Sequence, residues 1–142
     1  MTPDEQVFEI DAQSALIQTM VLVAAAEGTM SDAELEMMGR LVQSLPVFAS
    51  FDTRRIGAIG QECAALLEQE DGLDIAMNAI AHVLPSGLRE TAYTLACDVA
   101  AADGDVVAAE INLLDIIRDK LGIDRLTAAA IERAAQARFR VS

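Results

Sequence analysis

The sequence predicts an all-α protein of about seven helices, and three observations support this fold class. No stretch alternates apolar and polar residues with a period of two for long enough to form a convincing strand. Hydrophobic residues make up 53% of the 142 residues and aromatic residues only 4%, a composition that suits closely packed helices. An acidic turn also occurs twice in one register, which indicates two related halves.

The repeated unit is an apolar helix, an acid-glycine turn and a second helix with a glutamate near its start. The first copy contains Glu27-Gly28 and then Glu34, and the second contains Asp103-Gly104 and then Glu110. The offset is 76 residues both for the glycines (104 − 28) and for the later glutamates (110 − 34). We therefore expect two pseudo-symmetric three-helix units, with the first and fifth helices apolar and central.

The first helix is expected to run from a cap at Asp11 to about Glu27. It is apolar nearly all round, as expected for a buried central helix, and Gly28 follows as the residue that ends it. Ser31 and Glu34 then have the spacing of a capping box at the start of the second helix. This helix ends before Pro46, and its expected inward residues are Leu35, Met38, Leu41 and Leu45.

The third helix is expected to start at Asp52 and to be broken by residues 68–72. Its expected inward residues are Ile56, Ile59, Cys63, Leu66 and Leu67. Asp71 can cap a short fourth helix that Pro85 ends and that joins the two units. Its expected inward residues are Ile75, Met77, Ile80 and Val83.

The fifth helix is expected over about residues 86–102 and the sixth over about 106–121. Gly122 ends the sixth helix, and Asp124 caps a seventh. The expected inward residues of the fifth helix are Leu88, Ala92, Leu95, Ala96 and Val99. Those of the sixth are Ile111, Leu114, Ile117 and Leu121, and those of the seventh are Leu126, Ala130, Ile131 and Ala134.

Bulk properties indicate one domain over residues 1–142, with residues 1–10 as a loosely held lead-in. The net charge of −13 makes nucleic acid a poor partner, although acidity can equally serve solubility. The acidic start argues against a secretory signal, and the apolar run Met20–Ala26 is too short to span a bilayer, so we expect a cytoplasmic protein without membrane insertion. Cys63 and Cys97 are expected to be buried reduced thiols, and the lone His82 to be structural.

The acidic turns admit two interpretations. Glu27 and Asp103 would each lie in the last turn of a helix, where the dipole disfavours negative charge by about 0.3–1 kcal/mol. We call the two repeated turns, from Glu27 to Glu34 and from Asp103 to Glu110, the acidic corners. Either the acids accept hydrogen bonds from their own turns, or the two corners meet and bind a cation. Carboxylate oxygens suit Ca²⁺ or Mg²⁺ better than Zn²⁺, although the spacing is not that of an EF-hand. The candidate ligands are Glu27, Glu34, Asp103, Asp105 and Glu110.

The same residues resemble the TerB family of helical domains associated with tellurite resistance. The resemblance is carried by residues 24–34 and 101–110 and covers about residues 11–137. It implies a cytoplasmic all-helical fold with pseudo-symmetric halves and an acidic cation site formed by Glu27, Glu34, Asp103 and Glu110. It also implies a scaffold role in stress-response complexes that associate with membranes. Glu27 replaces the usual Asp of the family, and Val107 replaces the usual Ser.

Three functional hypotheses follow. The first is a non-catalytic, divalent-cation-responsive module that docks on other proteins. The second is a metal-independent interaction or oligomerisation domain, such as a homodimer, in which the acids only shape turns. The third, an enzyme, has little support because the sequence lacks a nucleophile–base pair and a glycine-rich phosphate loop.

Overall fold

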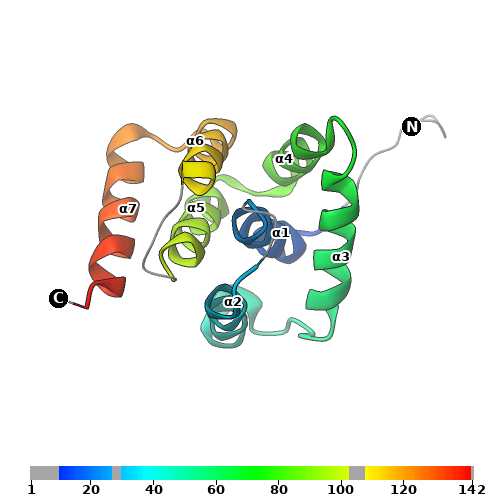
Figure 1. Cartoon of the computed structure of the whole chain (residues 1–142), viewed down its shortest axis with the longest axis horizontal. Coiled ribbons are helices and arrows are strands. Elements are labelled where there is room, and N and C mark those ends of the chain that lie inside the picture. The colour runs from blue at the N-terminus through cyan, green and yellow to red at the C-terminus, as the bar shows by residue number, and fades with distance from the viewer. Residues whose placement is uncertain (1–9, 27–29, 103–107, 142) are drawn as a thin grey trace.

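The computed structural model describes residues 10–26, 30–102 and 108–141. These residues form seven α-helices and one 3-10 turn, with no strand among them (Figure 1). The helices are α1 (Ala12–Ala24), α2 (Asp32–Ser44), α3 (Arg55–Leu67), α4 (Gly72–Val83), α5 (Ser86–Ala101), α6 (Ala108–Leu121) and α7 (Arg125–Phe139), and the 3-10 turn η1 is Pro46–Phe48. The all-α prediction is confirmed.

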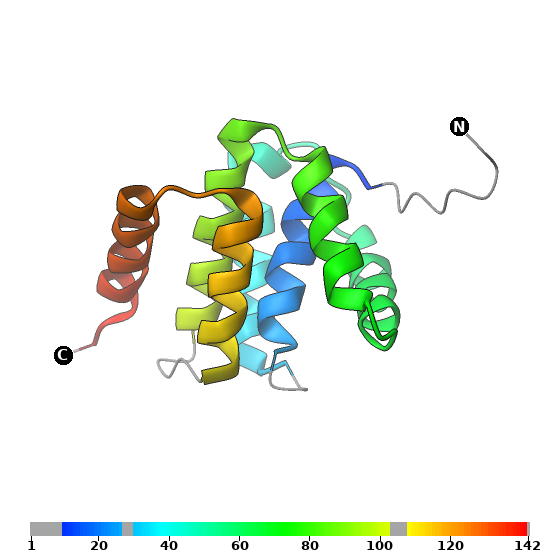
Figure 2. The ribbon, with the colours of Figure 1, turned by 90° about the horizontal axis from the view of Figure 1, so that it is seen from above.

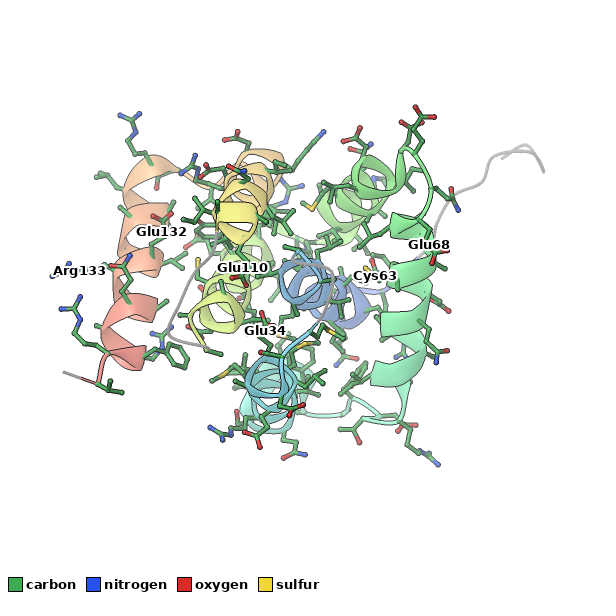
Figure 3. The ribbon with its side chains drawn as sticks, in the orientation of Figure 1. Glu34, Cys63, Glu68, Glu110, Glu132 and Arg133 are labelled. Carbon is green, nitrogen blue, oxygen red and sulfur yellow. The ribbon has the colours of Figure 1, made fainter. Side chains whose placement is uncertain are left out.

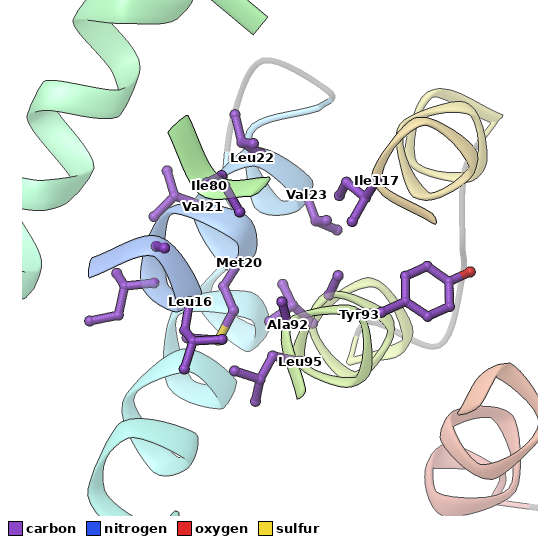
Figure 4. Packing of buried hydrophobic residues seen from close by; sticks show 14 of the residues in the cluster. Leu16, Met20, Val21, Leu22, Val23, Ile80, Ala92, Tyr93, Leu95 and Ile117 are labelled. Carbon is purple, nitrogen blue, oxygen red and sulfur yellow. The ribbon is translucent and has the colours of Figure 1, made fainter. Parts of the chain in front are cut away.

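The two apolar helices α1 and α5 pack on each other at the centre of the molecule. Every α1 side chain from Ser14 to Ala24 is buried, because the helix has no continuous polar stripe to face solvent. Figure 4 shows Leu16 and Met20 of α1 in the same part of the core as Leu95 of α5. The other helices cover this central pair.

The helix contacts repeat about a pseudo-twofold axis between α1 and α5. Helix α3 packs on α1 as α7 packs on α5, and α2 packs on α5 as α6 packs on α1. The predicted pseudo-symmetric three-helix units are therefore present. Helix α4 breaks the symmetry, since it packs against α1, α3 and α6.

Side-chain caps start several helices where the sequence predicts them. Asp11 accepts a hydrogen bond from the Ser14 amide at the start of α1, and Asp124 accepts from the Leu126 and Thr127 amides at the start of α7. Gly122 follows α6 with a φ of 66°, in the left-handed region that ends helices.

Two predicted helix ends and one predicted capping hydrogen bond are wrong. Helix α1 ends at Ala24, before the predicted end at Glu27. Helix α3 begins at Arg55, because the carboxylate of Asp52 bonds to the amide and guanidinium of Arg54 within the preceding turn. Asp71 precedes α4, but its side chain makes no capping hydrogen bond.

The predicted inward faces are correct for the central helices and partly wrong for the outer ones. Helix α7 buries Ala128 and Ala135 instead of the predicted Ala130 and Ala134, because it packs mainly on α5 through a narrow stripe. Predicted inward side chains also prove to be exposed in four other positions. They are Leu35, Ile75, Ile111 and Leu126.

Arg89 of α5 forms hydrogen bonds to the C-terminal ends of two neighbouring helices. Its guanidinium donates to the carbonyl oxygens of Ala81 and Leu84 at the end of α4 and of Leu121 at the end of α6. These carbonyls have no partner within their own helices, so a charged donor there stabilises both ends. No helix within the described ranges is long and apolar enough to cross a membrane.

Gly72 allows the close approach of α3 and α4. A Cβ atom at this position would lie 1.9 Å from the carbonyl oxygen of Leu66. We predict that Gly72→Ala lowers the free energy of unfolding by about 1–3 kcal/mol, because backbone must move. Gly39→Ala is the control: its Cβ would meet nothing within 4 Å, so it should stabilise α2 by about 0.5–1 kcal/mol. Urea unfolding measures both, and equal effects would contradict the steric argument.

Asp11 makes stability depend on pH at the start of α1. The hydrogen bond from the Ser14 amide, and then those from Ser14 and Arg55 side chains, hold its pKa below the ordinary 3.8. Because this pKa is lowered on folding, the ionised Asp11 carboxylate contributes its full stabilisation above about pH 4. This stabilisation is lost as the pH falls through the pKa of Asp11 in the folded state. We predict that Asp11→Asn, which keeps a capping side chain, costs less than about 1 kcal/mol at neutral pH and a smaller amount near pH 2. Urea unfolding at both pH values measures the difference in free energy of unfolding between the wild type and the variant. A difference that did not shrink in acid would contradict this account.

Candidate metal centre

Four helix ends define one end of the bundle. The end of α1, the start of α2, the end of α5 and the start of α6 lie together there (Figure 2). This arrangement follows from the pseudo-twofold axis, because in each half one helix ends there and the next one starts there. The prediction that the two corners face the same side of the molecule requires this arrangement.

Glu34 occupies the third position of α2 and is only 3% exposed. Its Oε1 accepts a hydrogen bond from the Ser31 amide at 2.9 Å, and its own amide donates to Ser31 Oγ at 3.1 Å. The predicted capping box is therefore confirmed. Capping alone does not require burial, and a buried glutamate is rare unless its charge is compensated.

Glu110 is the pseudo-symmetric counterpart of Glu34 and lies near the start of α6. It is 2% exposed and so is as buried as Glu34. Figure 3 shows both side chains toward the middle of the molecule, Glu34 from α2 and Glu110 from α6. Two carboxylates are thus taken out of water at equivalent positions of the two halves.

The neighbours of these glutamates are turned the opposite way. Leu35 follows Glu34 and is 47% exposed, and Ile111 follows Glu110 and is 49% exposed. Burial of apolar surface alone would favour the reverse orientation, with the leucine or isoleucine inside. In both halves the helix therefore presents a carboxylate to the interior and leaves an apolar side chain in solvent.

The described residues contain two of the five predicted ligands. Glu27, Asp103 and Asp105 lie outside them, as does Val107 at the position equivalent to Ser31. Within the ranges described, no three His, Cys, Asp or Glu side chains come together as a metal-binding group. Cation binding by the five acids stays a prediction.

Sequence reasoning missed a second polar cluster, between α5, α6 and α7. The Tyr93 hydroxyl donates to Glu132 at 2.6 Å, beside a cavity of about 280 Å³ that Cys97 also lines. Burial raises the pKa of Tyr93 and raises that of Cys97 to about 12, so both groups stay protonated at neutral pH. The cluster joins α7 to α5. Tyr93 and Glu132 are 39 residues apart, so no local motif marks the cluster.

The two cysteines are free and buried, as predicted. Burial raises the pKa of the Cys63 thiol to about 11. A thiol that stays protonated is a poor nucleophile and a poor metal ligand. His82 is exposed in the last turn of α4, with no metal-binding group around it in the part of the chain described.

Fold and site together define a class: an all-helical domain with two pseudo-symmetric halves, each of which buries a glutamate near the start of an equivalent helix. Within this class the chain belongs to the TerB family. The family model described as tellurite resistance protein TerB matches residues 13–134, which confirms the resemblance seen in the sequence. No curated protein and no solved structure gave a match.

Proposed function

We propose that this protein is a non-catalytic helical module that binds a divalent cation between its two acidic corners and acts as a scaffold or sensor in the response to tellurite or other chemical stress. The observation that carries the proposal is the paired burial of Glu34 and Glu110, at 3% and 2% exposure. Family membership supports the stress-response setting.

The energetic argument concerns what compensates two buried negative charges. Removing an ionised carboxylate from water costs several kcal/mol unless a partner of opposite charge or several hydrogen-bond donors offset the cost. A divalent cation would offset two carboxylates at once, and carboxylate oxygens are the ligands that Ca²⁺ and Mg²⁺ prefer over Zn²⁺. Glu27, Asp103 and Asp105 belong to the same two corners and would complete the oxygen shell.

A cation at this place would couple the two halves of the protein. Its ligands would come from the first turns of α2 and α6 and from the segments that join α1 to α2 and α5 to α6, so binding would hold both corners in one arrangement. A cytoplasmic scaffold could then present a different surface to partner proteins, including membrane-associated complexes, with and without the ion. The role needs no catalytic group, and the buried thiols and phenol are held in their unreactive protonated forms.

We predict that Ca²⁺ or Mg²⁺ raises the thermal midpoint of the wild-type protein. A ligand that binds only the folded state stabilises it by about 2.7 kcal/mol at one hundred times its Kd, which corresponds to several degrees. The double variant Glu34→Gln/Glu110→Gln should lose this shift. Glutamine also serves in a capping box and has nearly the shape of glutamate, so the variant is expected to keep its fold.

The matched control removes two exposed carboxylates from the same helices. Glu36 of α2 and Asp119 of α6 have side chains 71% and 80% exposed, so Glu36→Gln/Asp119→Asn changes the net charge equally. This control should keep the full shift. An absent shift at millimolar ion, or the same shift in both double variants, would remove cation binding from the proposal.

The alternative is a metal-independent interaction or oligomerisation domain, and the Ser31–Glu34 capping box favours it for one of the two acids. In that case the carboxylates only shape the turns at the starts of α2 and α6. The same thermal measurements separate the two functions, because a metal-indifferent protein leaves only the interaction role.

A further inference from the structure

The pseudo-twofold axis relates every helix except α4 to a partner. Helix α4 packs in the angle between α1, α3 and α6. The axis turns this place into the angle between α5, α7 and α2, where Figure 1 shows no helix of the described chain. One half of the framework therefore holds an amphipathic helix that the other half lacks.

Burial differs at the equivalent residues of the two sites. On α6, against which α4 packs, Ile117 is 0% and Leu121 is 2% exposed. Their counterparts 76 residues earlier, Leu41 and Leu45 of α2, are only partly buried. Where one half covers its apolar side chains with α4, the other half leaves them accessible.

The uncovered place is a groove with a defined lining. It has a volume of about 400 Å³ and lies between α2, α5 and α7. Leu41, Leu45 and Ile131 supply an apolar wall, and α5 contributes a polar side with Thr91, Thr94 and the carboxylates Glu90 and Asp98. Asp98 is paired with Arg138 of α7, so the exposed Glu90 is the lining carboxylate that gives the groove its negative charge.

We propose that this groove, between α2, α5 and α7, binds an amphipathic helix of a partner protein in the place that α4 takes in the other half. The partner helix carries an apolar ridge for Leu41, Leu45 and Ile131 and basic side chains for the Glu90 side. Charge complementarity selects this occupant, because the groove is acidic and the whole chain carries −13. An acidic second copy of this chain would meet repulsion there.

This inference deepens the interaction role proposed above and does not depend on the cation site. Binding of the helix is therefore measured in EDTA and again with Ca²⁺, while the thermal melts report on the ion separately. Failure of ion binding leaves the groove proposal intact, and failure of helix binding leaves the ion proposal intact.

The test uses two fluorescently labelled helical peptides of about five turns in anisotropy titrations against the full chain. Both carry leucines on one ridge (i, i+3, i+4, i+7), and they differ only in having lysine or glutamate on the flanks. The lysine peptide should bind saturably, and the glutamate peptide at least about tenfold more weakly. Glu90→Lys should weaken the lysine peptide about threefold or more, and Leu41→Gln should weaken it further.

Glu68→Lys is the matched control, since it reverses an exposed charge on the turn after α3, away from the groove (Figure 3). It should leave the affinity within about twofold, because rim charges outside an interface contribute little at physiological salt. Absence of saturable binding, or equal weakening by Glu68→Lys and Glu90→Lys, would overturn the proposal. Sedimentation that showed a dimer abolished by Leu41→Gln would also overturn it, because a second copy would then fill the groove.

Discussion

The burial of α1 from Ser14 to Ala24 at the centre of the molecule is the constraint on which the rest of the structure depends. A helix with no polar face must be covered on all sides, so the remaining elements have to wrap the central pair. The repeated sequence meets this demand twice, with α2 and α3 in one half and α6 and α7 in the other. The pseudo-twofold axis then brings the ends of α1 and α5, and the starts of α2 and α6, to one end of the bundle. The candidate metal centre is a consequence of how the core is covered.

The same constraint explains why Glu34 and Glu110 are unusual. Positions that face the central pair are normally filled by apolar side chains, and in both halves an apolar residue is available one position later. The helices nevertheless turn the carboxylates inward and leave Leu35 and Ile111 in solvent. The capping box accounts for one oxygen of Glu34. A shared cation is the proposal that uses both glutamates, because one ion could take oxygens from the equivalent positions of the two halves.

Much of the fold could be predicted from the sequence because helix-period patterns and cap residues are local signals. Asp11, Ser31, Gly122 and Asp124 act as predicted, and the constant offset of 76 residues correctly indicated two related halves. The faces of the outer helices were harder, because α7 buries Ala128 rather than Ala130 and alanine gives no strong pattern on either face. The Tyr93–Glu132 bond and the uncovered groove beside Leu41 depend on helices far apart in the chain, so no local motif could reveal them. At the candidate site the duplicated spacing identified Glu34 and Glu110, whereas their inward orientation could only come from the three-dimensional packing.

The central claim is that the two halves share an ion between Glu34 and Glu110, and a crystal structure grown with Ca²⁺ tests it most directly. We predict difference density for one ion within about 2.3–2.6 Å of carboxylate oxygens from both glutamates, with further oxygens from the two acidic corners. Clear density for both corners without an ion, and with each carboxylate bonded only to amides of its own turn, would contradict the account.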